Sequence, residues 1–153
     1  MNNSFLSEFQ IIGSSIKSLR IKNDFILLEN WSNKKRKIDI SHSVRNVEMI
    51  EEGKVLSGIV DLNIKVNIFE KKRKYNLDMT IEGCFNAPCE LGEETFNSML
   101  QINGITALYS IARGFVQSTS AQTLVSGYVL LPMINVVAYS RNLNQENNDA
   151  GVK

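Results

Sequence analysis

Two stretches that alternate strictly between apolar and polar residues constrain the fold more than any other feature of the sequence. Apolar side chains occupy every second position from Val60 to Ile68 and again from Tyr75 to Ile81. A period of two places one kind of side chain on each face of a β-strand. The charged stretch 70–74 separates the two runs, and a short polar break of this kind predicts an antiparallel hairpin. We therefore expect a sheet with one buried face and one face in water.

Further strands are expected before and after this hairpin. The second strand of the hairpin should continue to about residue 85, where the proline-containing stretch 86–88 breaks it. Alternation over 38–44 predicts another strand, with Ile38, Ile40, His42 and Val44 on one face. Residues 15–23 favour a strand that follows an irregular start, and 24–36 are interpreted as a connecting segment rich in apolar residues.

Helical patterns appear only in the second half of the chain. In Gly92-Glu93-Glu94, the two acidic residues suit a helix N-terminus, and a short apolar stripe follows until Asn103-Gly104 is expected to interrupt it. Apolar spacing of three and four predicts an amphipathic helix over about 105–120, with fraying expected over 117–123. Strands that precede helices indicate an α+β fold, with an antiparallel sheet and helices packed on one face.

Length and composition indicate one domain over residues 1–140, followed by a disordered tail at 141–153. No apolar run approaches the ~20 residues that a membrane-spanning helix needs, and the N-terminus lacks a secretory pattern. A cytoplasmic protein without membrane insertion is therefore expected. The net charge is +1, and the basic runs 34–37 and 70–74 lack interleaved aromatic residues. They are interpreted as solvated turns, so no nucleic acid is expected as a partner.

Few residues suggest catalysis or metal binding. The only histidine, His42, lies in line with apolar residues on a strand, which favours a structural role. The two cysteines, Cys84 and Cys89, do not form a Cys-x-x-Cys pair, and one histidine cannot complete a zinc site with them. We therefore expect two free thiols, no metal and no cofactor.

Trp31 stands outside any periodic strand or helix, close to the apolar stretch 25–28. Two interpretations are equally open. These side chains either fill the core of one subunit or form the wall of an apolar groove, since exposed apolar patches mark sites for partners or ligands.

Three ordered segments resemble the SecB family of export chaperones. Residues 82–85 (Glu-Gly-Cys-Phe) match a strand that ends in Gly-x-Phe. Residues 107–113 (Ala-Leu-Tyr-Ser-Ile-Ala-Arg) are similar to the helix motif Leu-Phe-Pro-Tyr-Ala-Arg-Glu, and 130–135 (Leu-Leu-Pro-Met-Ile-Asn) to Leu-x-Pro-x-Ile-Asn. The resemblance extends over about residues 9–140.

The resemblance implies a four-stranded antiparallel sheet backed by a long helix, assembled as a homotetramer that is a dimer of dimers. Such chaperones use no ATP and hold unfolded polypeptides in apolar grooves. By position in the family, Trp31 falls in the crossover loop beside the groove, and Ile134 falls near the groove's other wall. Phe25 and Tyr128 are expected to contribute to the same surface.

Export members of the family also dock on the translocase ATPase, SecA, through an acidic face of the sheet. Asp24 and Asp78 match acidic docking positions, whereas Arg20 and Asn76 stand where an acid and a leucine are expected. These departures, together with the near-neutral net charge, weaken the expectation of docking.

Three functions follow. The favoured one is an ATP-independent holdase for unfolded clients, as in preprotein export. The second is a dedicated chaperone of one partner such as an antitoxin, because the SecB family includes such members. The third is an enzyme on an α+β scaffold, which would need a polar pocket around His42 or a cysteine.

Overall fold

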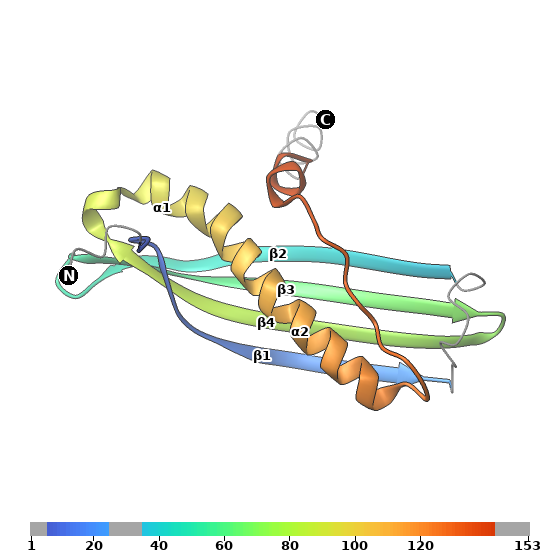
Figure 1. The fold of residues 1–153 in the computed structure, drawn as a ribbon. Helices are drawn as coiled ribbons and strands as arrows, with labels where there is room; N and C mark the ends of the chain where they lie inside the picture. The colour runs from blue at the N-terminus through green and yellow to red at the C-terminus, as the bar shows by residue number, and fades with distance from the viewer. Residues whose placement is uncertain (1–5, 25–34, 143–153) are drawn as a thin grey trace, which may run out of the picture.

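The computed structural model of the chain describes residues 6–24 and 35–142. Four long strands precede the helices in this part of the chain, and every neighbouring pair is antiparallel, in the order β1-β4-β3-β2 (Figure 1). The strands are β1 (Gln10–Asn23), β2 (Lys35–Ile50), β3 (Val55–Glu70) and β4 (Arg73–Pro88). The predicted hairpin is β3–β4, and Lys71 takes a positive φ of 53° in its turn.

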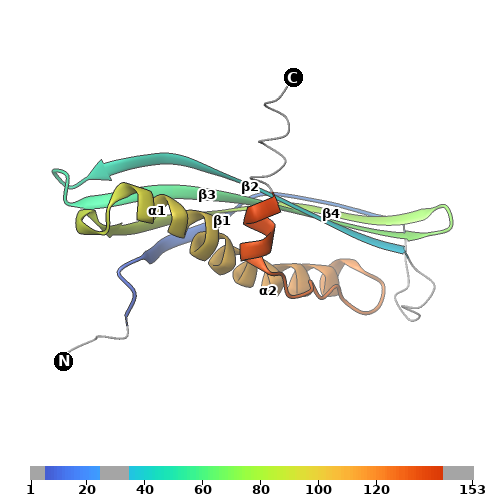
Figure 2. The same cartoon turned by 90° about the horizontal axis from the view of Figure 1, so that it is seen from above.

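The helical elements lie on one side of this sheet (Figure 2). After the 3-10 turn η2 (Cys89–Leu91), the chain forms α1 (Glu93–Met99), the π-helical turn η3 (Leu100–Gly104) and α2 (Ile105–Thr123). Residues 136–142 are helical again. The α+β fold with a four-stranded antiparallel sheet and helices on one face is confirmed. None of the described helices is both long and apolar enough to cross a membrane.

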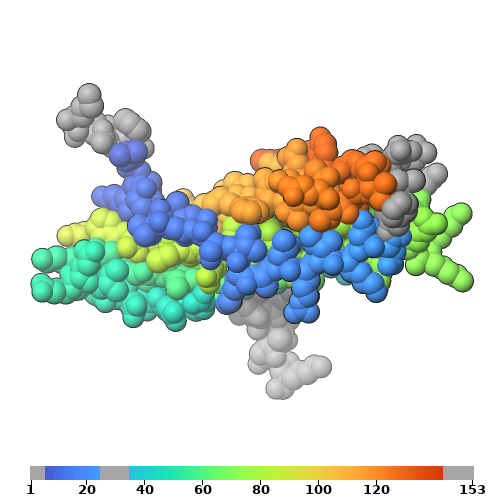
Figure 3. All heavy atoms as spheres, turned by 90° about the horizontal axis from the view of Figure 1, so that it is seen from below, coloured from blue at the N-terminus to red at the C-terminus, as the bar shows by residue number. Residues whose placement is uncertain are grey.

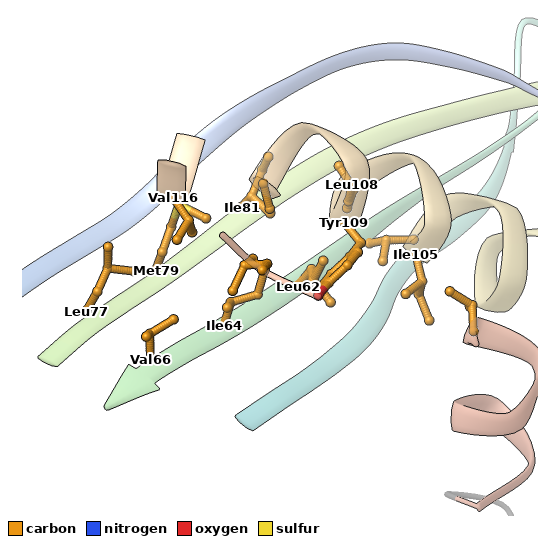
Figure 4. Packing of buried hydrophobic residues seen from close by; sticks show 14 of the residues in the cluster. Leu62, Ile64, Val66, Leu77, Met79, Ile81, Ile105, Leu108, Tyr109 and Val116 are labelled. Atoms are coloured by element: carbon orange, nitrogen blue, oxygen red, sulfur yellow. The ribbon is translucent and has the colours of Figure 1, made fainter. Parts of the chain in front are cut away.

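The core lies between α2 and the apolar face of the β3–β4 hairpin (Figure 4). The face predicted from the alternation is confirmed, since its residues are at most 1% exposed. They are Val60, Leu62, Ile64, Val66 and Ile68 on β3, and Tyr75, Leu77, Met79 and Ile81 on β4. The side chains of α2 that seal this face are Ile105, Leu108, Tyr109, Ala112 and Val116.

Two glycines let the helix lie close to the sheet. A Cβ on Gly83 would lie 2.7 Å from Cδ2 of Leu108, and one on Gly104 would lie 3.2 Å from Cγ2 of Val60. The expected interruption at Asn103-Gly104 is confirmed only in part, because the α-helix gives way to a π-helical turn there but the chain stays helical. The chain continues through it as a π-helical turn, because the glycine packs against β3 and the tertiary contact outweighs its low helix propensity.

Several strand boundaries also differ from the expectation. β2 extends over Lys35–Ile50 rather than 38–44, so residues 35–37 of the first basic run lie in a strand and not in a turn. β1 begins at Gln10 rather than near residue 15, because Phe9 anchors its start by stacking on Phe85 with ring centroids 5.1 Å apart. Shifts of register along β1 accommodate Gly13 within the pairing to β4. β4 runs through 86–88 and ends at Pro88, whose position at the strand terminus costs no ladder hydrogen bond.

The far end of α2 is held rather than frayed, so that expectation is also wrong. The hydroxyl groups of Thr123 and Tyr75 are 2.8 Å apart, which ties the last turn of the helix to β4. Of the expected tail at 141–153, residues 141 and 142 end the helical stretch, and 143–153 lie outside the described residues. A single domain over 1–140 stays a prediction.

Candidate functional site

The main candidate is an extended segment, residues 124–135, that runs back along one flank of α2 (Figure 1). The backbone leaves the helix at Leu124 with φ −83° and ψ 151°, and Gly127 supplies a turn with φ 74°. A segment of this length without helix or strand structure could collapse in many ways. Its course is instead set by hydrogen bonds from the helix beside it.

Three side chains of α2 hold the backbone of the extended segment. Each of these bonds satisfies a main-chain group that has no partner within a helix or sheet ladder. They are the Val129 N–H to Ser120 Oγ (2.7 Å), Arg113 Nε–H to the Leu131 carbonyl (3.0 Å) and the Tyr109 hydroxyl to the Pro132 carbonyl (2.6 Å). Burial raises the pKa of Tyr109, although the charge of Arg113 opposes this, so the phenol remains a donor at neutral pH.

Alternation along the extended segment separates inward from outward side chains. Val129 and Leu131 are fully buried against the core, whereas Tyr128, Leu130 and Met133 are 45%, 47% and 80% exposed. We use the term apolar ridge for the exposed apolar residues of this part of the chain, which are Val125, Tyr128, Leu130, Met133 and Val137. The ridge offers mainly apolar contact area, and the hydroxyl of Tyr128 is the one polar group among its side chains.

The predicted groove residues have different places in the structure. Tyr128 belongs to the apolar ridge, and Ile134 is half-buried against the core next to it. Phe25 and Trp31 lie outside the described residues. The other ridge residues were missed individually, although Gly127 and Pro132 within an apolar stretch were a signal that no helix forms there.

The predicted docking acids are engaged with neighbouring residues. Asp24 pairs with Lys74 of β4 through two bonds, from its own N–H to the Lys74 carbonyl (2.9 Å) and from the Lys74 N–H to Asp24 Oδ2 (3.1 Å). Asp78 accepts a hydrogen bond from Asn63 Nδ2 at 2.8 Å, and Lys65 Nζ lies 3.9 Å from it. Asp78 therefore faces a basic residue on the polar side of the sheet, whereas Asp24 bonds to the backbone of Lys74.

A larger polar network crosses that side of the sheet. Arg45 of β2 donates to Asp61 of β3 at 2.7 Å and to Glu82 of β4 at 2.6 Å, while Ser15 and Lys17 of β1 approach the same two acids. Partial burial alone would raise the pKa of Asp61, but the hydrogen bond and charge of Arg45, with Lys17, lower it below the usual value. The outward-facing polar side chains of this network thus provide one another with hydrogen-bond and ion-pair partners.

His42 is placed for structure rather than for catalysis. It faces the helices, where Nε2 donates to Gln101 Oε1 at 2.6 Å and the Tyr139 hydroxyl lies 3.0 Å from Nδ1. These bonds join β2 to the π-helical turn η3 and to residues 136–142. Cys84 lies on the other face of the sheet, so no thiol pairs with this imidazole.

The second thiol offers no activated nucleophile either. Partial burial, together with the carboxylate of Glu90, raises the pKa of the Cys89 thiol, so it stays protonated at neutral pH. Neither cysteine nor His42 is fully buried, so burial does not by itself exclude the enzyme hypothesis. Within residues 6–24 and 35–142, no three His, Cys, Asp or Glu side chains are grouped as metal ligands.

Comparisons with known proteins agree with this architecture. No family model matches the sequence, and the search of curated proteins found no match. The solved structure of a SecB-like chaperone from Mycobacterium tuberculosis, in complex with a ChAD peptide from an antitoxin, superposes with a TM-score of 0.63. The similarity covers 83% of this chain and 91% of that chain, at 13% identity. This chain has the SecB-like fold.

The resemblance inferred from the sequence motifs is thereby confirmed at the level of the fold. A protein of unknown function from Streptococcus agalactiae is also similar, at 14% identity over 82% of this chain and 97% of that chain. Its TM-score of 0.48 is too low to support a conclusion. Within the SecB-like fold, the extended segment and its apolar ridge follow the helix that covers the sheet.

Proposed function

We propose that the protein is an ATP-independent chaperone that holds unfolded or partly folded polypeptides against the apolar ridge. The observation that carries the proposal is the anchored extended segment, which keeps Tyr128, Leu130 and Met133 pointing into solvent. The SecB-like fold supports it, and the similar chaperone from Mycobacterium tuberculosis was solved with a bound peptide. No cofactor enters the mechanism.

The energetics suit a holdase. Burying one large apolar side chain contributes about 1.5–3 kcal/mol, so several such contacts hold a client without geometric selectivity. The three anchors prevent the ridge from folding back on the core, which would remove that contact area. A protein that binds only the unfolded form of a client delays its folding and aggregation by mass action.

The full groove is expected to have two walls. Tyr128 and Ile134 are proposed for the wall formed by the extended segment. Phe25 and Trp31 are proposed for the opposite wall, in the crossover between β1 and β2. The site of action we propose is the cytoplasm, where a holdase meets newly made chains.

The proposed assembly is a homotetramer, a dimer of dimers. β1 borders the sheet and lies along α2 at the surface (Figure 3), and its outer edge has no partner strand among the described residues. Leu19 on β1 and Phe115 on α2 are 43% and 46% exposed. Pairing of two β1 strands about a twofold axis would cover this edge and these side chains. Sedimentation equilibrium of the purified chain tests it, and a monomer at micromolar concentration would contradict it.

The experiment for the chaperone function is suppression of aggregation. A chemically unfolded client is diluted into buffer with stoichiometric amounts of the protein, and light scattering is followed. We expect the wild type to suppress scattering and the double variant Leu130→Asp/Met133→Asp to lose most of that effect. The control is Met49→Asp, which changes a side chain that is 59% exposed on β2, away from the ridge. Unchanged scattering with the wild type would contradict the proposal.

A dedicated chaperone for one partner is the second candidate function. It is favoured by the antitoxin peptide bound to the similar chaperone from Mycobacterium tuberculosis. It predicts one tightly bound protein in a pull-down from the native host and little effect on generic unfolded clients. Recovery of many unrelated polypeptides would support the general holdase instead.

An export role would additionally require docking on SecA through Asp24 and Asp78. Asp78 already lies 3.9 Å from the ammonium of Lys65, and Asp24 accepts a hydrogen bond from the backbone N–H of Lys74, so both carboxylates have partners within the chain. We expect Asp24→Asn/Asp78→Asn to change co-purification with SecA by less than about twofold, as is typical of exposed ion pairs. Loss of co-purification in that variant would establish the docking site.

A further inference from the structure

Charged residues are segregated between the two ends of the sheet. At one end, the last residues of β1, the first residues of β2 and the β3–β4 turn come together. The described basic residues of this basic end are Lys22, Lys35, Arg36, Lys37, Lys71, Lys72, Arg73 and Lys74, against the acids Asp24 and Glu70. The net charge of +1 therefore conceals a strongly basic edge.

The opposite end is acidic. It contains the β2–β3 turn and the start of α1, and its only described basic residue is Lys54. Its exposed acids are Glu8, Glu48, Glu51, Glu52, Glu90, Glu93 and Glu94. A strand of 16 residues is about 50 Å long at 3.3 Å per residue, which is several Debye lengths at physiological salt. A bound molecule thus meets the two ends as separate surfaces.

The apolar ridge starts at the basic end. Asn23 Nδ2 donates to the Thr123 carbonyl at 2.6 Å, and the Thr123 hydroxyl lies 2.8 Å from that of Tyr75. The extended segment begins at the next residue, so Val125 is the ridge residue nearest to the turn. Lys72 lies three residues beyond Tyr75 along the hairpin, a distance on the order of 10 Å and about one Debye length.

We propose that the basic end selects clients in which an acidic stretch flanks the apolar segment that lies on the ridge. This inference rests on the proposed chaperone function and adds the class of client. Apolar contact area and positive charge adjoin along one path, and an extended polypeptide can follow both at once. Opposite charges near a binding site raise both the rate of encounter and the specificity.

Other polyanions fit the arrangement less well. A bilayer needs apolar side chains beside the basic residues at the tip, but of the exposed large apolar residues described, only Phe69 lies at the turn. Tyr128, Leu130 and Met133 instead lie back along the helix face. A single-stranded nucleic acid is held best where several aromatic side chains are interleaved with the basic ones for stacking, and Phe69 is the exposed aromatic residue described at this turn.

The test uses three fluorescent peptides with one shared apolar core, flanked on one side by three Asp, three Ser or three Lys residues. Binding to the full chain is measured by fluorescence anisotropy at low salt and at about 0.5 M salt. At low salt we expect the Asp-flanked peptide to bind about tenfold more tightly than the Lys-flanked one. The difference should shrink to less than about twofold at high salt, where the charges are screened.

The variant is Lys22→Glu/Lys72→Glu, which changes two exposed residues on different elements of the basic end. We expect it to remove or reverse the preference while the Ser-flanked peptide binds as before. The control is Lys54→Glu, a single reversal of charge at the acidic end, and it should leave the preference intact.

The outcomes separate this inference from the chaperone function. If none of the three peptides binds, the proposed function itself fails. If all three bind equally at low salt, the chaperone function stands and the charge preference is overturned. The charge preference is also overturned if the variant keeps the preference but no longer binds anionic vesicles or RNA, because the basic end would then bind another polyanion. The same holds if the variant keeps the preference but dissociates in sedimentation, because the basic end would then bind a second copy of the chain.

Discussion

The β3–β4 hairpin and the extended segment share an alternating pattern but differ in what they present to water. Their inward residues are alike, and Leu62 and Leu131 are both fully buried. Most outward residues of the hairpin are polar, and several bond to one another, as Asn63 does with Asp78 at 2.8 Å. Outward residues of the segment are apolar, as Leu130 is. The alternation identifies the buried face, while the chemistry of the other face indicates whether a partner is needed.

The inward positions of the hairpin should show the largest effect on stability. Leu62→Ala removes buried methyl groups and leaves a cavity, so we expect the free energy of unfolding to fall by about 2–5 kcal/mol. Its outward counterpart, Leu130→Ala, should change that free energy by less than about 0.5 kcal/mol. Urea unfolding followed by circular dichroism measures both. Equal losses would show that the ridge is part of the core.

The anchors of the extended segment should come next. Ser120→Ala leaves the Val129 N–H without its acceptor in a fully buried position, which costs about 1–3 kcal/mol. Amide hydrogen exchange at Val129 should accelerate by at least tenfold. The control is Ser110→Ala on the same helix, an exposed residue whose hydroxyl bonds only to the Thr106 carbonyl of its own helix. Unchanged protection in Ser120→Ala would mean that packing alone holds the segment.

Local pattern was sufficient for the elements in which pattern and tertiary contact agree. The alternation at 60–68 and 75–81 correctly predicted the buried face, and the spacing at 105–120 correctly predicted the main helix. The motifs around 107–113 and 130–135 added the four-strand topology through the family resemblance. The alternation of apolar and polar residues alone did not predict that topology.

The remaining differences come from contacts between residues far apart in the sequence. Asn103-Gly104 predicts a break in the helix, but Gly104 packs on Val60 and the chain stays helical there as a π-helical turn. The start of β1 depends on Phe9 meeting Phe85, a pairing that only the folded sheet provides. The sequence located the candidate site in part, through Tyr128 and the motif at 130–135, which contains Pro132. Which of its residues point outward depends on the bonds from α2.

The polar network on the outward face of the hairpin should contribute less, and it should depend on pH. Partial burial opposes the effect, but Arg45 lowers the pKa of Asp61 in the folded state. This carboxylate therefore stabilises the fold fully above the unfolded pKa of about 3.9 and loses that contribution as the pH falls through the lower folded pKa. We expect Asp61→Asn to cost about 1 kcal/mol at pH 7 and progressively less as the pH is lowered below about 3.9. Asp39→Asn, in a more exposed pair with Lys37, should show little change at either pH.

The smallest effect on stability is expected at the most exposed ridge residue. Met133→Gln keeps the length of a side chain that is 80% exposed, so the free energy of unfolding should change by less than about 0.5 kcal/mol. The same change should weaken binding of an apolar client peptide several-fold, because it replaces contact area by a group that must be desolvated. Anisotropy and urea unfolding on one preparation measure both quantities. A loss of stability without a loss of client binding would contradict this assignment. The ridge would then stabilise the fold, as the polar network on the sheet does, and would not bind clients.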